Sequence, residues 1–345
     1  MKHATRLTSL LGLGVMLVAS GCCHLRYLPA ARGPAAVPQQ VVEAIAYHRP
    51  GRLICTESNV EANARFTVQR IETAALANHV RTNRMLTLDY YRPVGTNRTP
   101  VILVLPIIGG GYPLEKIFCA YFARQGMAAV LVRRDRLKKT IERLEEVDDI
   151  LRQAAVDARQ TIDWVETRSE LDASRIGVFG ISMGGIRAAF LAPLDSRIRA
   201  AAIGLAGGDI PDIITHSTEP GLAKRRRSYM DRSGLSEQEF KRELQKVIKC
   251  DPLTVAPSMD PGKVLLVISL VDTAVPTPRQ LELRRALGKP ETVFLPTGHY
   301  SAFLFVPYIK SACLRFFKEK LAGDEPSAIP LANRNSPWPA SMSRH

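Results

Sequence analysis

The order of apolar and amphipathic segments along the chain predicts a sheet of buried strands separated by helices. Continuous apolar runs, typical of strands buried on both faces, occur at 101–105, 128–132, 175–179, 199–205, 263–269 and 292–295. Apolar side chains at helical spacing occur at 114–125, 148–167 and 308–321. Repeated strand–helix units predict an α/β fold, a mostly parallel central sheet with helices on both faces.

Three further segments complete this organisation. Two strands at 66–71 and 85–91 are expected to lead the sheet as an antiparallel pair. A helical insert of about residues 207–260 separates two of the apolar runs, with helices expected at 219–233 and 236–250. The insert either roofs the active site or is a surface excursion, and the pattern alone does not rank the two.

The most informative motif is Gly-x-Ser-x-Gly at 180–184, with Ser182 at its centre. An apolar run precedes it and a helical stretch of small residues follows it, so the order is strand, sharp turn, helix. A serine on such a turn takes a strained backbone conformation and presents its hydroxyl at the top of the sheet. We therefore predict Ser182 as a nucleophile. The alternative is a glycine-rich turn in which the serine only caps the helix.

A serine nucleophile needs a base, and the base needs an acid to orient it. His299 directly follows the last predicted strand, where its ring can reach a hydroxyl at the carboxyl edge of the sheet. Asp272 comes just after the preceding strand, and Asp209, after an earlier one, is the competing acid. The order Ser182, Asp272, His299 is that of α/β-hydrolases, so we predict these three as the catalytic residues.

The chain is strongly basic, with a formal net charge of +14 and an isoelectric point of about 9.7. Basic runs at 133–139 and 224–227 could attract anionic lipids or acidic polymers, although solvated faces are the commoner origin of such runs. We find no nucleic-acid-binding module and predict no nucleic-acid partner. The six cysteines have no spacing that indicates a zinc site, and we predict no metal. Cys119 and Cys313 lie in apolar helical patterns and are expected to be core thiols.

The N-terminus has the pattern of a targeting segment. Lys2 and Arg6 precede an apolar stretch at 10–19 that is too short for a comfortable membrane span. The following residues, Ser20-Gly21-Cys22, resemble the lipobox of bacterial lipoproteins, which implies lipidation of Cys22. We therefore expect a signal peptide at 1–22 and an exported, membrane-anchored protein of the cell envelope. An ordinary secretory signal or an uncleaved anchor is the alternative.

Composition sets the remaining boundaries. Residues 23–45 are rich in proline and alanine and are expected to form a tether. Residues 46–322 then form the folded domain. Residues 323–345 contain four prolines and no periodicity, which predicts a loose tail.

Residues of about 85–321 resemble an α/β-hydrolase of the dienelactone-hydrolase and prolyl-oligopeptidase-like branch. The stretches that carry the resemblance are 162–164, 171–185, 251–253, and Asp272 followed by Val275-Pro276. The resemblance implies hydrolysis of esters or related acyl compounds without a metal or an organic cofactor. Dienelactone hydrolases proper use a cysteine nucleophile, and this chain has Ser182 in that place.

The same resemblance locates an oxyanion hole made of backbone N–H groups. One donor lies in the loop after the first buried strand, at 105–111. Pro106 has no N–H, so Ile108 is the predicted donor, with Ile107 as the alternative. The second donor is the N–H of Met183, which follows the nucleophile.

These residues predict a serine hydrolase that cleaves a small-molecule acyl substrate through an acyl-enzyme intermediate. An acyltransferase using the same three residues, or a non-catalytic lipoprotein that binds through this fold, is the alternative. The sequence leaves the identity of the substrate and the oligomeric state open.

Overall fold

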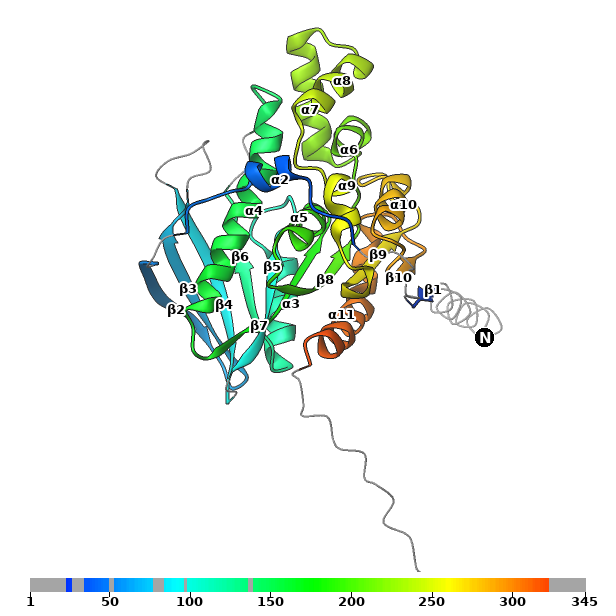
Figure 1. The fold of residues 1–345 in the computed structure, drawn as a ribbon. Helices are drawn as coiled ribbons and strands as arrows, with labels where there is room; N and C mark the ends of the chain where they lie inside the picture. Colours follow the sequence, from blue (N-terminus) through cyan, green and yellow to red (C-terminus); the bar gives the residue numbers. More distant parts are fainter. Residues whose placement is uncertain are drawn as a thin grey trace, which may run out of the picture.

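The computed structural model describes residues 23–26, 34–49, 53–76, 84–95, 98–135 and 139–322. Within these residues, ten strands form one sheet in the order β1-β10-β9-β8-β7-β5-β6-β4-β3-β2 (Figure 1). The strands are β1 (Cys23–Leu25), β2 (Cys55–Ala62), β3 (Phe66–Ala74), β4 (Met85–Pro93), β5 (Thr99–Leu105), β6 (Ala128–Val132), β7 (Leu171–Ile181), β8 (Ile198–Gly204), β9 (Val264–Ser269) and β10 (Glu291–Leu295).

The strands from β10 to β6 in this order pair in parallel, and antiparallel strands flank them on both sides. The predicted mostly parallel sheet is therefore confirmed. The leading antiparallel unit contains β2 in addition to the two predicted strands. The side chains of β2 are mostly polar and exposed, so no apolar pattern marks this strand in the sequence.

Helices cover both faces of the sheet. Successive residues of a strand face opposite sides, so Leu103 of β5 packs with helices α4 and α5, whereas Val104 packs with α3 and α11. The helices are α2 (Gln39–Ala44), α3 (Pro113–Arg124), α4 (Glu145–Glu166), α5 (Met183–Leu191), α6 (Ile210–His216), α7 (Pro220–Ser233), α8 (Glu237–Val247), α9 (Pro252–Val255), α10 (Thr277–Ala286) and α11 (Val306–Lys320).

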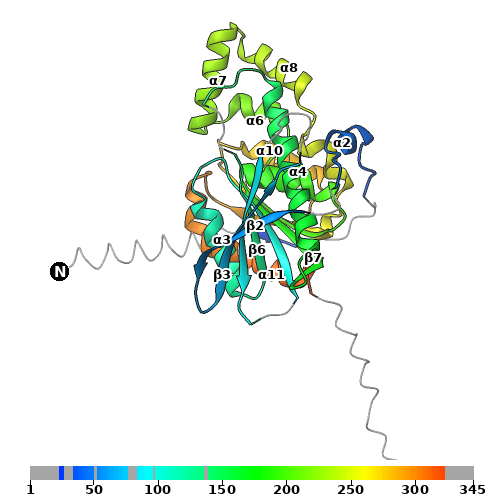
Figure 2. The ribbon, with the colours of Figure 1, turned by 90° about the vertical axis from the view of Figure 1, so that its left-hand side faces the viewer.

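The insert between β8 and β9 is helical, as expected, and begins with α6, which was not predicted. Both views show α7 and α8 standing above the end of the sheet (Figures 1 and 2). Helix α8 starts with a capping box: the hydroxyl of Ser236 accepts from the N–H of Glu239, and the carboxylate of Glu239 accepts from the N–H of Ser236. The predicted start of this helix is therefore confirmed, and its end lies at Val247.

Parts of the segment expected to be a tether pack against the domain instead. Strand β1 pairs antiparallel with β10, with Cys23 opposite Phe294. Val41 of α2 and the adjacent Ile45 are buried in the main core cluster. The free energy gained by burying these apolar side chains exceeds the conformational entropy that the segment loses when it packs. The predicted signal peptide at 1–22, with Cys22, and the predicted tail at 323–345 lie outside the described residues.

The cysteines of the described part of the chain are free thiols. Cys119, Cys250 and Cys313 are buried, which confirms the prediction of core thiols for the first and last of them. Burial raises the pKa of Cys250 and of Cys313 to about 12, so these thiols stay protonated and unreactive at neutral pH. Among the described helices, none combines the length and the apolar character that a membrane span requires.

Candidate active site

Ser182 lies on a sharp turn between β7 and α5. Its backbone has a φ of 56° and a ψ of −125°, a region that costs a non-glycine residue free energy. The backbone N–H of Ser182 donates to the carbonyl of Gly204 in β8 at 2.9 Å, which holds the turn against the neighbouring strand. The strain and the bond together present the hydroxyl at the carboxyl edge of the sheet.

Two glycines of the motif are required by close backbone contacts. A Cβ atom on Gly180 would lie 2.2 Å from the carbonyl carbon of Gly184, and a Cβ atom on Gly184 would lie 2.1 Å from the carbonyl oxygen of Leu105. Neither backbone can move aside without displacing a central strand or the helix. The glycines therefore let β5, β7 and α5 approach closely enough to form the turn.

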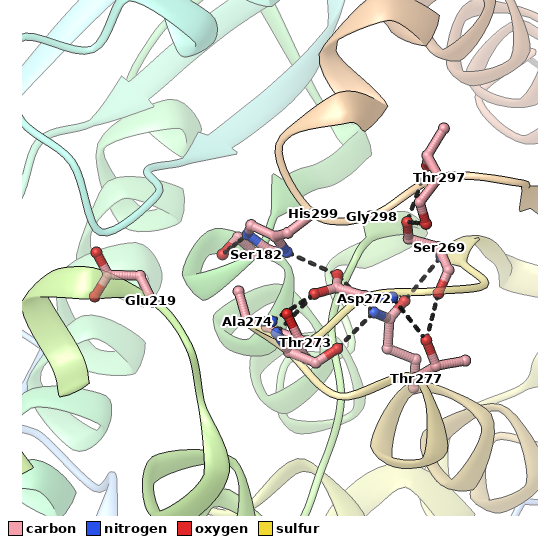
Figure 3. Close-up of polar contacts among 12 residues, drawn as sticks. Ser182, Glu219, Ser269, Asp272, Thr273, Ala274, Thr277, Thr297, Gly298 and His299 are labelled. Carbon is pink, nitrogen blue, oxygen red and sulfur yellow. Dashed lines mark hydrogen bonds and ion pairs between the residues drawn. The ribbon is translucent and has the colours of Figure 1, made fainter.

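The structure brings Ser182, His299 and Asp272 together in one hydrogen-bonded series (Figure 3). Nε2 of His299 lies 3.0 Å from Oγ of Ser182, and Nδ1 lies 2.7 Å from Oδ2 of Asp272. The three residues come from different loops, each directly after a strand of the parallel sheet. When Nδ1 carries the ring proton and donates it in a hydrogen bond to the carboxylate, the lone pair of Nε2 faces the hydroxyl.

Asp272 is held from several sides. Its side chain has no exposed surface, and Oδ1 accepts from the N–H groups of Ala274 and Val275, both at 2.9 Å. Oδ2 accepts from Nε2 of Gln280 at 2.9 Å in addition to His299. These donors stabilise the charged carboxylate without a cationic partner. Gln280 of α10 was not predicted, because a glutamine inside a helix belongs to no sequence motif.

The competing acid Asp209 is engaged elsewhere. It is the N-cap of α6, where its side chain accepts from the N–H of Asp212. Its other oxygen accepts from Nη1 of Arg279 at 2.9 Å. The structure therefore pairs His299 with Asp272 and leaves Asp209 with a capping role.

The loop after β5 is fixed by two charged side chains. The N–H of Ile107 donates to the buried carboxylate of Glu115 at 2.7 Å and is thereby occupied. Arg134 donates to the carbonyls of Ile107, Ile108 and Gly109. Among the described residues, no acceptor takes the N–H of Ile108. This geometry favours Ile108 over Ile107 as the loop's donor.

Arg134 was considered from sequence only as part of a basic run. Burial lowers its pKa below the usual range, and its guanidinium bonds to carbonyl oxygens rather than to a carboxylate. The positive charge therefore lies beside the predicted oxyanion hole. Three carbonyls converging on one guanidinium also restrict the conformation of the loop.

A cavity of about 320 Å³ opens beside Met183 and Ile108. Its walls are mostly apolar and come largely from α4, α5, the insert and the segment between β6 and α4. The insert contributes Ile210, Ile213, Ile214 and Leu222. The loop between α6 and α7 is also attached to the acid loop, since the hydroxyl of Ser217 donates to the carbonyl of Ala274 at 2.6 Å. The insert therefore roofs this cavity.

Comparisons with known proteins agree with this architecture. The model of the dienelactone hydrolase family matches residues 89–228. An acetyl xylan esterase from a Paenibacillus species superposes with a TM-score of 0.62 at 22% identity, over 82% of this chain and 93% of that one. This chain therefore has the α/β-hydrolase fold. Acetyl xylan esterase 1 from a Thermoanaerobacterium species has the same fold, with a TM-score of 0.56 at 16% identity over 80% and 96% of the two chains.

The curated relatives match a smaller part of the chain. Two proteins of Mycobacterium tuberculosis, both described as uncharacterized, are 27% identical to this chain over 158 residues. The match covers 44% of this chain and only 34% of either relative. Within the described residues, no three or more histidine, cysteine, aspartate or glutamate side chains gather in a group that could hold a metal ion.

Proposed function

We propose that the chain hydrolyses a carboxylic ester through a Ser182–His299–Asp272 triad and an acyl-enzyme intermediate. The observation that carries this proposal is the hydrogen-bonded series itself, with 3.0 Å from Oγ to Nε2 and 2.7 Å from Nδ1 to Oδ2. The dienelactone hydrolase match and the esterase names of the structural neighbours support an ester as the substrate.

The mechanism follows from the position of each group. Oγ of Ser182 attacks the acyl carbonyl while Nε2 of His299 takes its proton. The resulting imidazolium is stabilised by Asp272, and the oxyanion accepts from the N–H groups of Ile108 and Met183. Nε2 then returns the proton to the leaving alcohol. Water, activated by the same nitrogen, attacks the acyl-enzyme and releases the acid.

Hydrolysis of 4-nitrophenyl esters of graded chain length tests this proposal, together with labelling by a fluorophosphonate probe. We expect hydrolysis of at least part of the series and a single covalent adduct, found on Ser182 by peptide mass spectrometry. Full-length protein that neither hydrolyses any ester nor reacts with the probe would contradict the proposal. Labelling of a different serine would assign the role of nucleophile to that serine instead of Ser182.

We also propose that Cys22 is lipidated and holds the enzyme on a membrane of the cell envelope. The sequence Ser20-Gly21-Cys22 after a short apolar segment supports this. Two or more acyl chains bury enough methylene groups for stable attachment, at about 0.8 kcal/mol for each buried CH₂. Since β1 begins at Cys23, the acyl chains would be attached directly beside the edge of the sheet.

The anchor predicts a fractionation result. Native protein should stay with membranes in high salt, which screens the attraction of basic surfaces for anionic lipids, and should incorporate labelled palmitate. Cys22→Ser should lose the label and either become soluble or persist as the precursor, whereas Cys23→Ser is the matched control and should keep it. Label that survives in Cys22→Ser and vanishes in Cys23→Ser would assign the other cysteine. An unlabelled native protein would rule the anchor out.

A further inference from the structure

The cavity beside the nucleophile contains a buried arginine without a partner. Arg187 of α5 is only 6% exposed and lines the cavity. Its Nε is enclosed and makes no hydrogen bond, and among the described residues no carboxylate or carbonyl accepts from the guanidinium. Buried arginines are almost always paired, because an uncompensated charge in a protein interior is costly. A ligand is the partner that would remove this cost.

Helix geometry directs Arg187 toward the reaction centre. Arg187 follows Met183 by four residues, so the two side chains share one face of α5. Helical side chains lean toward the N-terminus of their helix, and Ser182 lies at that end of α5. The Cα atom of Arg187 is about 7.5 Å from that of Ser182 along the helix axis, at about 1.5 Å per residue. A short acyl chain can therefore span the distance between the reacting carbonyl and the guanidinium.

The charges around the cavity leave Arg187 uncompensated. Asp157 is the carboxylate whose charge acts on Arg187, but its two oxygens already accept from Arg84, both at 2.9 Å. Arg134 and Arg225 add further positive charge to the wall. Burial, and then repulsion from Arg134, lowers the pKa of Arg187 to about 10. The guanidinium therefore stays charged at neutral pH and can bind an anion.

The other acidic groups of the wall are Asp135, which pairs with Arg84 at 2.6 Å, and two residues of α4. Asp149 and Glu146 line the cavity there. Burial raises the pKa of Asp149, and Arg152 and Arg143 are the cations that act on it. Neither carboxylate bonds to Arg187 in the structure.

The cavity is placed to receive the acyl half of the substrate. The leaving alcohol must lie next to Nε2 of His299, which protonates it. The described wall of the cavity contains Met183 and Ile108, the predicted oxyanion donors, but no residue of the His299 loop. An acyl group bound in the oxyanion hole therefore extends into the cavity, away from His299 and toward Arg187.

We infer that the acyl half of the substrate ends in a carboxylate, and that Arg187 binds this carboxylate in the cavity. The inference rests on the proposed ester hydrolysis and specifies its substrate class, half-esters of dicarboxylic acids. Water and the half-ester give the dicarboxylate and the free alcohol. The apolar walls contact the methylene groups, and the planar guanidinium can bind the terminal carboxylate with two parallel hydrogen bonds.

The test compares esters of equal length with and without the terminal charge. The 4-nitrophenyl monoesters of adipic and suberic acid are measured against the hexanoate and octanoate, with subtraction of uncatalysed hydrolysis. We expect kcat/KM to favour the anionic ester by at least about tenfold in one of the two pairs. Arg187→Met should reduce that ratio about 10- to 100-fold, as expected for the loss of a charge-assisted bond. Arg187→Lys should keep part of the preference.

Arg227→Met is the matched control, because Arg227 is an exposed arginine of α7 that does not line the cavity. It removes the same charge and should leave the ratio unchanged. An unchanged ratio in Arg187→Met, or equal use of charged and neutral esters by the native enzyme, would overturn the inference and leave ester hydrolysis intact.

Binding to a protein that cannot turn over separates the two proposals. Calorimetry with Ser182→Ala should show monomethyl adipate binding at least about tenfold more tightly than methyl hexanoate, and Arg187→Met in that background should abolish the difference. If the native protein hydrolyses no ester but Ser182→Ala still binds monomethyl adipate more tightly, the proposal of ester hydrolysis is refuted and the proposal of a carboxylate site is supported. Equal binding of the two esters would refute the site.

Discussion

Replacing Ser182 by alanine should reduce ester hydrolysis by at least about a thousandfold and abolish labelling by a fluorophosphonate. The hydroxyl is the atom that attacks the carbonyl, and it is the group that Nε2 of His299 contacts at 3.0 Å. The residual activity of the variant should come from direct attack by water, which the oxyanion donors and the binding cavity still stabilise. The measurement is kcat/KM on a short 4-nitrophenyl ester.

Ser182→Ala should fold like the native protein. The backbone keeps its φ of 56°, which costs alanine about as much as serine, and the bond from the residue 182 N–H to Gly204 does not involve the side chain. Thermal unfolding of both proteins provides the control. Native-like stability together with native-like hydrolysis would refute Ser182 as the nucleophile.

The part of this molecule that the sequence predicts is the part made of continuous apolar runs and glycine-dependent turns. Strands β5 and β6 are buried on both faces, so their continuous apolar runs are visible in the sequence. The motif around Ser182 is equally constrained, because Gly180 and Gly184 are needed by contacts of little more than 2 Å. Strand ends then place Asp272 and His299 at the same edge as the serine.

The elements that the sequence did not predict depend on tertiary contacts. Strand β2 is polar and exists because it pairs with β3, and α2 is only six residues long and is held by Val41. Gln280 and Arg134 act through hydrogen bonds that depend on the folded loops, to the carboxylate of Asp272 and to the carbonyls of the loop after β5. A single sequence contains no spacing rule for such pairs.

The insert illustrates the same limit for function. Its helical character could be predicted from composition and from the capping box at Ser236. Its position over the cavity follows instead from bonds between loops, such as Ser217 to Ala274. Side chains that line the cavity from the insert therefore could not be assigned to the substrate before the fold was known.

Asp272→Asn should reduce kcat by about four orders of magnitude, the effect expected when the histidine of a triad loses its acidic partner. The asparagine would still accept from Ala274 and Val275, so the loop should keep its conformation. Its NH₂ group would take the place of Oδ2 and face both His299 and Gln280. The imidazole N–H on Nδ1 would then meet a donor instead of an acceptor. The imidazole would be driven to the tautomer that has its proton on Nε2, which cannot accept from Ser182.

Asp209→Asn is the matched variant, because it makes the same chemical change at the competing acid. Asparagine is as good an N-cap as aspartate, and the ion pair with Arg279 is partly exposed, so its loss should cost no more than about 1 kcal/mol of stability. Activity should therefore change by less than about threefold. Steady-state kinetics of both variants decide the assignment, since a larger loss in Asp209→Asn than in Asp272→Asn would transfer the role of the acid to the end of β8.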